Sequence, residues 1–264
     1  MCGIVGYIGQ RKAYPILIKG LKRLEYRGYD SAGVALISAD RQLNVYKTKG
    51  KVSDLETFVT QKDISGSIGI AHTRWATHGE PCSVNAHPHY SSSERFALIH
   101  NGIIENYMTL KKELIEKGHV FKSETDTEVV AHLAEELDDG NFLSTVRKVL
   151  AKIEGSYSLV FMDDSDPDTI ICTKKDNPLI IGLGKGENFI ASDIPAVINR
   201  TRQIYIMNDY ELAVVKKDSI TFYDHDDKEI TKEIHEVTWS AEAAEKGGYP
   251  HFMQIGRASC RERV

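Results

Sequence analysis

The hydrophobic pattern in the first third of the chain predicts several strands and one early helix. Residues 4–9 form a short apolar run that is typical of a buried strand. Leu17, Leu21 and Leu24 then recur at helical spacing, and Gly28 is a suitable end signal for that helix. Further strand patterns occupy residues 32–38, 43–48, 67–72 and 95–100.

Helical periodicity dominates the middle of the chain. One helix is predicted over 105–117, with Gly118 as its end signal. A second is predicted to begin at Thr125, because Thr125 and Glu128 have the spacing of a capping box. A third is predicted over 142–153.

The second half is rich in short strand patterns joined by tight loops. They occupy residues 157–162, 169–173, 179–183, 189–191, 204–207, 211–215 and 220–223. The pattern lacks regular strand–helix–strand units, and the helices are grouped together. These features predict an α+β fold with antiparallel sheets.

Composition restricts the classes of partner. The 33 basic and 38 acidic side chains give a net charge of −5, which disfavours a nucleic-acid or anionic-membrane surface. No apolar run approaches the ~18–20 residues that span a bilayer. The start of the chain lacks the basic region of a secretory signal, and the four cysteines are far apart. We therefore expect a cytoplasmic protein without nucleic-acid or membrane partners.

The C-terminal end differs in composition from the rest. Residues 240–248 are small and polar, as in an exposed linker. Residues 255–264 carry three arginines and a cysteine with almost no apolar pattern. We expect a domain over 2–239, the start of an interdomain linker over 240–254, and an unrelated, non-native tail over 255–264.

Cys2 is the first candidate for chemistry. If Met1 is removed, the α-amino group of Cys2, with an ordinary pKa of ~7.7–8.0, can act as a base for its own thiol. Nucleophile and base would then occupy one residue, as in N-terminal threonine enzymes. The alternative interpretation is a half-buried cysteine in a fraying first strand.

The segment 72–81 is dense in hydrogen-bonding groups and follows an apolar strand. Arg74 could hold a carboxylate through the two-point geometry of a guanidinium. Thr77 and His78 could complete that site, with Trp75 as a lid. The alternative is a surface loop in which the arginine and tryptophan only pack together.

Histidines in and after this segment raise the question of a metal. The set comprises His72, His78, His87 and His89, with Cys82 among them. Their spacings match neither a paired-ligand structural site nor a His-Glu-x-x-His helix. We therefore predict no metal site.

Two later segments are further candidates. Asn101-Gly102 carries the strongest short hairpin signal, but the Asn101 amide and the Gly102 N–H could instead form an oxyanion hole. The acidic run 123–128 at a helix start is explained by the helix dipole. That explanation leaves open a role for Asp126 in binding a ligand ammonium.

In this order, six segments closely resemble the glutaminase domains of the glucosamine-6-phosphate synthases, the isomerizing glutamine–fructose-6-phosphate aminotransferases. The segments are CGIVGY (2–7), LEYRGYDSAG (24–33), HTRWATHG (72–79), NAHPH (85–89), HNGIIEN (100–106) and SETDTE (123–128). The resemblance covers about residues 2–240 and continues through the linker to Gln254. It implies an N-terminal-nucleophile (Ntn) hydrolase fold, a four-layer αββα sandwich with antiparallel sheets.

The resemblance also implies roles for individual residues. Cys2 would attack the glutamine amide, and Asn101 and Gly102 would hold the oxyanion. The remaining roles are binding of the glutamine carboxylate by Arg74, Thr77 and His78, binding of its ammonium by Asp126, and gating of ammonia transfer by Trp75. No cofactor is implied. Arg27 and His87 lie in matching motifs without a derived role.

The resemblance implies that sugar isomerisation lies in further domains after the linker. L-glutamine is then the expected ligand of this chain, and fructose 6-phosphate is reached only through the missing isomerase domain. We expect the isolated domain to be a monomer, although full-length relatives are oligomeric. Two alternatives stay open: a glutaminase of another class II amidotransferase, and a glutamine-binding module without turnover.

Overall fold

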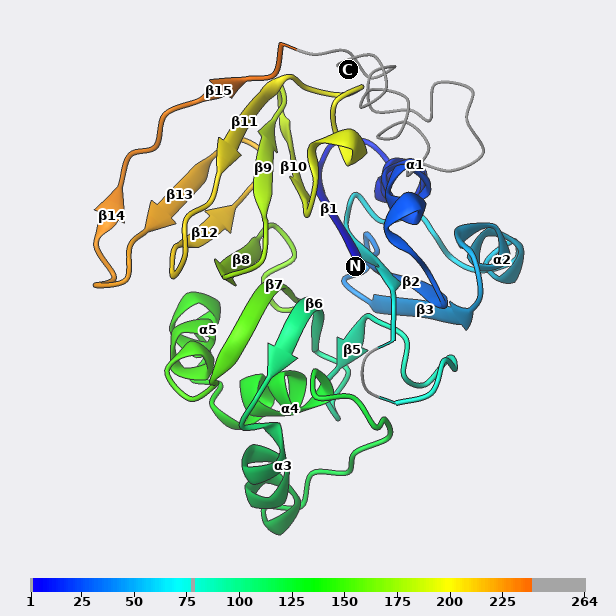
Figure 1. Ribbon diagram of the computed structural model, residues 1–264, viewed down its shortest axis with the longest axis vertical. Coiled ribbons are helices and arrows are strands. Elements are labelled where there is room, and N and C mark those ends of the chain that lie inside the picture. The colour runs from blue at the N-terminus through cyan, green and yellow to red at the C-terminus, as the bar shows by residue number, and fades with distance from the viewer. Residues whose placement is uncertain (1, 77–78, 239–264) are drawn as a thin grey trace, which may run out of the picture.

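Two antiparallel β-sheets packed face to face form the centre of the computed structural model, which describes residues 2–76 and 79–238 (Figure 1). The eight strands of the first sheet are β1 (Gly3–Gly9), β2 (Ser31–Ile37), β3 (Leu43–Lys49), β4 (Ile68–Arg74), β9 (Ile180–Leu183), β10 (Glu187–Ala191), β11 (Gln203–Ile206) and β15 (His235–Glu236). The seven strands of the second are β5 (His89–Tyr90), β6 (Phe96–Ile104), β7 (Gly155–Asp163), β8 (Ile170–Lys175), β12 (Leu212–Val215), β13 (Ile220–Tyr223) and β14 (Glu229–Ile230).

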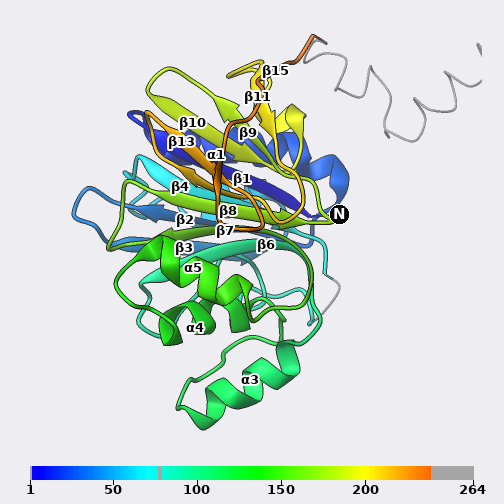
Figure 2. The ribbon, with the colours of Figure 1, turned by 90° about the vertical axis from the view of Figure 1, so that its left-hand side faces the viewer.

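Helices cover the outer faces of both sheets (Figures 1 and 2). The first sheet is covered by α1 (Ala13–Leu24) and α2 (Val52–Phe58), and the second by α4 (Glu128–Glu136) and α5 (Phe142–Leu150). Outside α4 lies α3 (Tyr107–Glu116). Short 3-10 turns occupy Glu25–Arg27 and Ile194–Ala196.

Alternation along the strands builds three separate apolar cores. In β1, Val5 and Tyr7 pack against the first helical layer, whereas Ile4 and Ile8 face the other sheet. Strand β6 alternates in the same way between the inner core and the core under α4 and α5. Both sheets are thus buried on both faces, which creates the four layers of an αββα sandwich.

The strand order brings distant segments together. β1 lies inside the first sheet, between β10 and β4, with Gly3 opposite Thr73. In the second sheet β6 pairs with β7 over nine residues, from Phe96–Asp163 to Ile104–Gly155. The start of the chain therefore lies beside the C-terminal end of β4, and β6 contacts both β1 and β4 across the inner core.

The α+β fold with antiparallel sheets agrees with the sequence prediction, and each predicted strand has a counterpart. The predicted helix start at Thr125 is wrong, because α4 begins at Glu128. Instead of closing a capping box, the Glu128 carboxylate accepts hydrogen bonds from the backbone N–H groups of Lys122 and Ser123, at 2.9 and 2.7 Å. The short helix α2 was not predicted.

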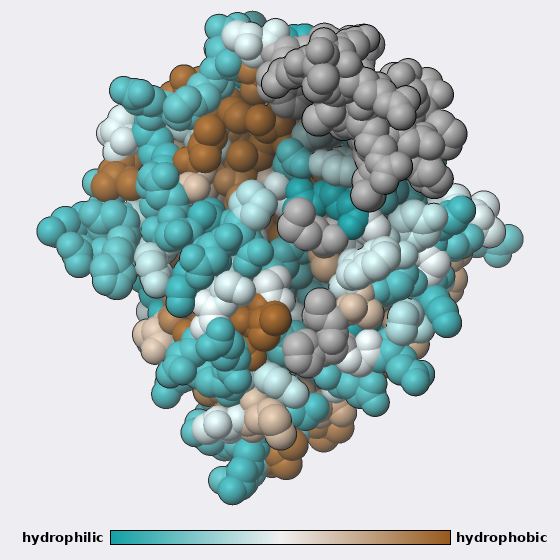
Figure 3. Space-filling view, viewed as in Figure 1, coloured by the Kyte–Doolittle hydropathy of each residue, from teal (hydrophilic) through white to brown (hydrophobic). Residues whose placement is uncertain are grey.

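The surface seen in Figure 3 is mostly hydrophilic, and its largest apolar area lies over β9 and β11, where Ile206 is 45% exposed. Among the residues that the structure describes, no helix combines the length and the apolar character needed to cross a membrane. The predicted linker (240–254) and tail (255–264) lie outside the described residues, as do Thr77 and His78.

Candidate active site

Cys2 lies at the edge of a cavity of about 350 Å³ where the ends of inner strands from both sheets meet. The cavity brings together eight segments of the chain. Its lining includes Cys2, Arg27, Arg74, Trp75, His87, His100, Asn101, Gly102, Asp126, Ser156, Asn177 and Pro178. All of the predicted site residues that the structure describes are in this set, although 124 positions separate the first from the last of them (126 − 2).

The Cys2 sulfur is held by the backbone of the segment that follows β4. Its Sγ accepts a hydrogen bond from the Trp75 N–H at 3.1 Å. Burial raises the pKa of the Cys2 thiol, while the Trp75 N–H and the charge of Arg74 oppose that shift. The thiol is therefore predominantly protonated near neutral pH, and it needs a base in order to react.

The Asn101 side chain is fixed at both ends. Its Oδ1 lies 2.9 Å from His72 Nε2, and its Nδ2 donates to the Cys2 carbonyl oxygen at 3.3 Å. Because Oδ1 can only accept, His72 must donate through Nε2–H. This contact orients the amide so that its N–H groups are on the side of Cys2, which is the arrangement that an oxyanion donor needs.

Gly102 belongs to β6 rather than to a hairpin turn, so the Asn-Gly turn alternative is wrong. Its φ of 130° lies in a region that side chains rarely adopt. A Cβ atom here would stand 2.0 Å from the Ser156 carbonyl oxygen on the paired strand. Glycine is thus required for β6 to carry an irregular residue and still pair with β7.

Four buried histidines stand beside this amide: His72, His87, His89 and His100, called here the inner histidines. The rings of His72 and His87 stack at 4.3 Å between centroids. Burial lowers the pKa of His72 to about 3 and holds the pKa values of the other three below their ordinary range. The group is therefore neutral, and His72 donates a hydrogen bond without carrying charge.

Arg74 is the last residue of β4 and is 4% exposed. One guanidinium nitrogen, Nη2, donates to the Gly79 carbonyl at 3.1 Å, and Nη1 lies 4.0 Å from Asp30 Oδ1. Asp30 also accepts from Ser31 Oγ at 2.8 Å and from the Ala76 N–H. These contacts hold a cation at the cavity wall, where it can meet an anionic ligand group.

Asp126 supplies the opposite charge, from the loop before α4. It is 7% exposed, and its Oδ2 accepts from the Ile104 N–H at 2.7 Å. The carboxylate is thereby tied to the end of β6 while it lines the cavity. An arginine, a carboxylate and an amide donor around one thiol suit a ligand that has a carboxylate, an ammonium and a polar carbonyl.

Several lining residues had no role in the sequence analysis, among them Asn177, Pro178 and Arg27. Asn177 and Pro178 come from the connection between β8 and β9, and Ser158 Oγ donates to their carbonyls at 3.1 and 3.3 Å. No sequence signal marked this loop. Arg27 reaches the cavity while it pairs with Asp193 at 3.1 Å.

Trp75 lies over the entrance and is 55% exposed. Gly28, with a φ of 103°, lies directly beneath it, because a Cβ at Gly28 would stand 2.2 Å from the indole ring. The predicted stop of the first helix thus also makes room for this side chain.

A double antiparallel sheet covered by helices on both sides, with a cysteine thiol at the start of an inner strand, places the chain among the Ntn hydrolases. The solved structure of glutamine phosphoribosylpyrophosphate amidotransferase from B. subtilis, complexed with ADP and GMP, is similar with a TM-score of 0.73. That likeness has 26% sequence identity and covers 85% of this chain and 49% of the other.

Sequence comparisons give the particular family. The profile described as "Glutamine amidotransferase domain" matches residues 72–199. Glutamine–fructose-6-phosphate aminotransferase [isomerizing] of Bacteroides thetaiotaomicron is 59% identical over 257 residues, covering 96% of this chain and 42% of that protein. The enzyme of the same name from Caldanaerobacter subterraneus is 55% identical over 253 residues, covering 96% and 41%.

The chain therefore belongs to the class II glutamine amidotransferases, as a glutaminase domain of the glutamine–fructose-6-phosphate aminotransferase type. It spans about two fifths of the length of the curated relatives it matches.

Proposed function

We propose that this domain hydrolyses L-glutamine to glutamate and ammonia with Cys2 as the nucleophile. The observation that carries this proposal is the Asn101 amide in the same cavity as Cys2: it donates to the Cys2 carbonyl at 3.3 Å, and its direction is fixed by His72 at 2.9 Å. Asn101 Nδ2 carries two N–H groups and the Cys2 carbonyl takes one. The other is available to a developing oxyanion.

The reaction has two halves. The sulfur attacks the side-chain amide carbon of glutamine, a C–S bond forms, and the carbonyl electron pair moves to oxygen. The thiol proton is passed to the amide nitrogen, the C–N bond breaks, and ammonia leaves a γ-glutamyl thioester. Water then attacks the thioester, the C–S bond breaks, and the sulfur recovers a proton as glutamate is released.

A base for the thiol is the main requirement of this scheme. Because burial raises the pKa of the Cys2 thiol, the residue does not ionise readily by itself. The α-amino group of Cys2 can take the proton, provided that Met1 has been removed. We infer that removal of Met1 is needed for turnover.

The other polar groups of the cavity would bind the two charged groups of glutamine. Its carboxylate would lie against Arg74 and its ammonium against Asp126, each a charge-assisted contact in a buried setting. By resemblance, Thr77 and His78 would complete the carboxylate site. Gly102 would contribute its backbone N–H to the oxyanion.

We further propose that the longer protein passes the ammonia to fructose 6-phosphate, because the relatives named above carry that aminotransferase name. Trp75, exposed over the cavity, is suited to close the route when an acceptor domain is present. We infer a cytoplasmic, monomeric domain that keeps its thiols reduced. Cys2, Cys82 and Cys172 are free thiols.

The test is intact mass after incubation with an electrophilic glutamine analogue, together with glutamate release from glutamine. We expect a mass without Met1, one adduct per chain, and glutamate formation. Cys2→Ala should abolish both adduct and glutamate, while Cys82→Ala, the same change at another half-buried cysteine, should keep both. Glutamate release by Cys2→Ala would disprove the assignment.

The acceptor proposal is tested separately with the 264-residue chain. Given glutamine and fructose 6-phosphate, it should release glutamate and ammonia but form no glucosamine 6-phosphate. Two results together would support both the glutaminase and the acceptor proposals. The chain should release glutamate without forming the amino sugar, and the amino sugar should form once the longer protein is supplied. Formation of glucosamine 6-phosphate by this chain would contradict the need for a further domain.

A further inference from the structure

A second pair of histidines lies away from the cavity, in the helical layer on the second sheet. His119 follows α3, and His132 projects from α4 together with Glu135. The Nδ1 atoms of the two imidazoles are 3.3 Å apart, and Glu135 Oε2 is 3.8 Å from His119 Nδ1. One ligand atom from each of the three side chains lies within 4.8 Å of the other two.

The far side of each imidazole faces a further carboxylate. His119 Nε2 is 3.3 Å from Glu136 Oε2, and His132 Nε2 is 3.6 Å from Glu128 Oε1. An ionised carboxylate only accepts, so a neutral His119 presents its N–H at Nε2, and the 3.6 Å approach of Glu128 favours the same tautomer for His132. Two Nδ1 lone pairs and the Glu135 carboxylate then converge on one point, and this arrangement calls for a cation.

The three groups are held in place by their surroundings. The Glu135 carboxylate accepts from the backbone N–H groups of Ser92 and Ser93, at 3.0 and 2.8 Å. The Phe121 ring packs against the His132 ring at 4.4 Å between centroids. Such support keeps the side chains in position before any ion arrives.

We propose that His119 Nδ1, His132 Nδ1 and the Glu135 carboxylate bind one Zn²⁺ ion, with water as the fourth ligand. Zinc prefers imidazole and carboxylate in a tetrahedron, with Zn–N of about 2.0–2.1 Å. Tetrahedral geometry at that length separates two ligand nitrogens by roughly 3.3–3.4 Å, which agrees with the 3.3 Å between the Nδ1 atoms. The carboxylates at both Nε2 atoms are the outer partners that zinc histidines usually have.

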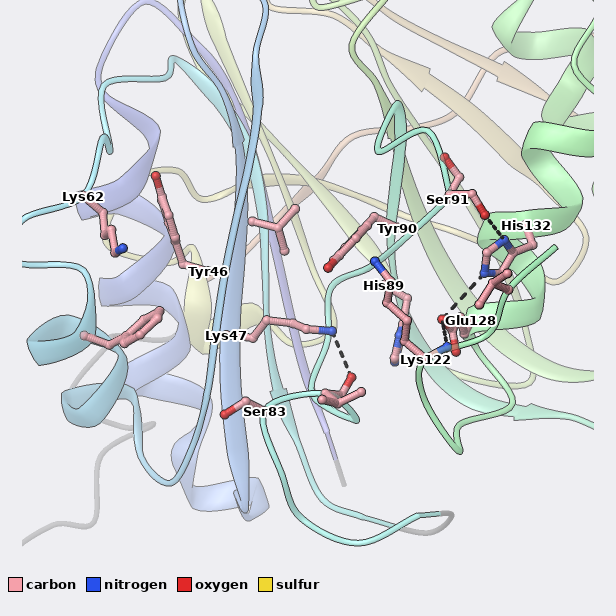
Figure 4. A pocket seen from close by; sticks show the side chains of 15 residues that line it. Tyr46, Lys47, Lys62, Ser83, His89, Tyr90, Ser91, Lys122, Glu128 and His132 are labelled. Carbon is pink, nitrogen blue, oxygen red and sulfur yellow. Dashed lines mark hydrogen bonds and ion pairs between the residues drawn. The ribbon is translucent and has the colours of Figure 1, made fainter.

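One of the three proposed ligands, His132, also borders a cavity. His132 and Glu128 stand in the wall of a cavity of about 440 Å³, shown in Figure 4, in which Lys122 lies beside Glu128 and Lys47 comes from strand β3. A bound ion would join the loop after α3, helix α4 and the turn at Ser92. Since that loop carries Asp126, zinc would stiffen the segment next to the proposed glutamine site.

Metal uptake by the 264-residue chain, first stripped with a chelator, tests the proposal. We expect one zinc per chain by elemental analysis. Co²⁺ in its place should give the visible absorption of a tetrahedral site without a thiolate charge-transfer band. His119→Ala and Glu135→Gln should each lose stoichiometric binding. The matched variants His225→Ala and Glu113→Gln should keep it.

A change outside the ligand set gives an independent readout. Glu136→Gln keeps all three ligands and removes the carboxylate at His119 Nε2, so zinc should bind about 10- to 100-fold more weakly. The proposal is overturned if the stripped wild-type chain takes up no zinc, as expected when the imidazoles share only a proton. Unchanged affinity in His119→Ala and Glu135→Gln, or a thiolate band, would overturn it equally.

Discussion

The two histidine groups of this domain contain the same side chain in opposite settings. The inner histidines are enclosed by strands and other imidazoles, near the cation of Arg74, which lowers the pKa of His72 further. His119 and His132 instead face carboxylates at 3.3 and 3.6 Å. In the first setting an imidazole is a neutral donor, and in the second it is a metal ligand or a shared base.

The difference shows that the groups around an imidazole determine its protonation and the contacts it can make. The sequence brings His72, His78, His87 and His89 close together along the chain, but their spacing gave no metal-ligand pattern, and the rings of His72 and His87 stack on each other. Spacing gave no reason to consider His119 with His132, which lie on different elements. They meet because the loop after α3 lies against α4, where His119 contacts both His132 and Glu136.

The strongest test of the inner group is Asn101→Ala, which removes the amide that His72 orients. Turnover of glutamine should fall roughly 100- to 1,000-fold, as for loss of an oxyanion donor, with little change in the glutamine concentration for half-maximal rate. Steady-state glutamate release measures both quantities. A variant that kept its turnover and bound glutamine poorly would assign Asn101 to binding.

His72→Leu asks whether the donor behind the amide matters. His72 is a positioning residue here, so turnover should fall about 10- to 100-fold through misplacement of Asn101. His72→Gln can still donate to Asn101 Oδ1 and should recover part of that loss. Equal activity in the two variants would show that only the packing of His72 is important.

The pH dependence of unfolding tests the neutrality of the group. The pKa of His72 is about 3 in the folded chain, below its ordinary value. The contribution of His72 to the free energy of unfolding is therefore complete above that ordinary value. It is lost as the pH falls toward 3, because the unfolded chain then binds a proton that the folded chain does not. For His72 alone, the free energy of unfolding should fall by about 2 kcal/mol between pH 7 and pH 5.

Urea unfolding of wild type, His72→Leu and the control His225→Ala at both pH values measures this loss. The leucine variant should be less sensitive to pH by about that 2 kcal/mol. Identical pH dependence in the three proteins would mean that His72 is not held neutral.

The smallest expected effect is that of Arg74→Lys. A lysine keeps the charge near the inner histidines but cannot grip a carboxylate at two points. The glutamine concentration for half-maximal rate should rise about tenfold, with turnover nearly unchanged. An unchanged glutamine dependence would remove Arg74 from the binding site.

Much of the fold could be predicted because most of the longer strands are buried, with successive side chains in different cores. Apolar side chains at period two, such as Val5 and Tyr7 against Ile4 and Ile8, require two packing partners, and the structure supplies both. Local signals were less reliable. Asn101-Gly102 predicts a hairpin, but nine pairings between β6 and β7 outweigh a two-residue preference.

The sequence by itself determined the alternation of apolar and polar side chains along the strands and the thiol near the start of the chain. It also determined the set of polar groups that could bind glutamine. Residue type alone fixes the chemical character of Cys2, Asn101, Arg74 and Asp126: a thiol, an amide, a cation and an anion. Only the tertiary structure decided which groups meet. It placed His72 next to the Asn101 amide and brought Asn177 to the cavity wall. It also paired the Glu128 carboxylate with the Ser123 N–H instead of closing a capping box. The physical reason is that burial and hydrogen-bond partners depend on sheet pairing and layer packing between segments that are far apart in the chain.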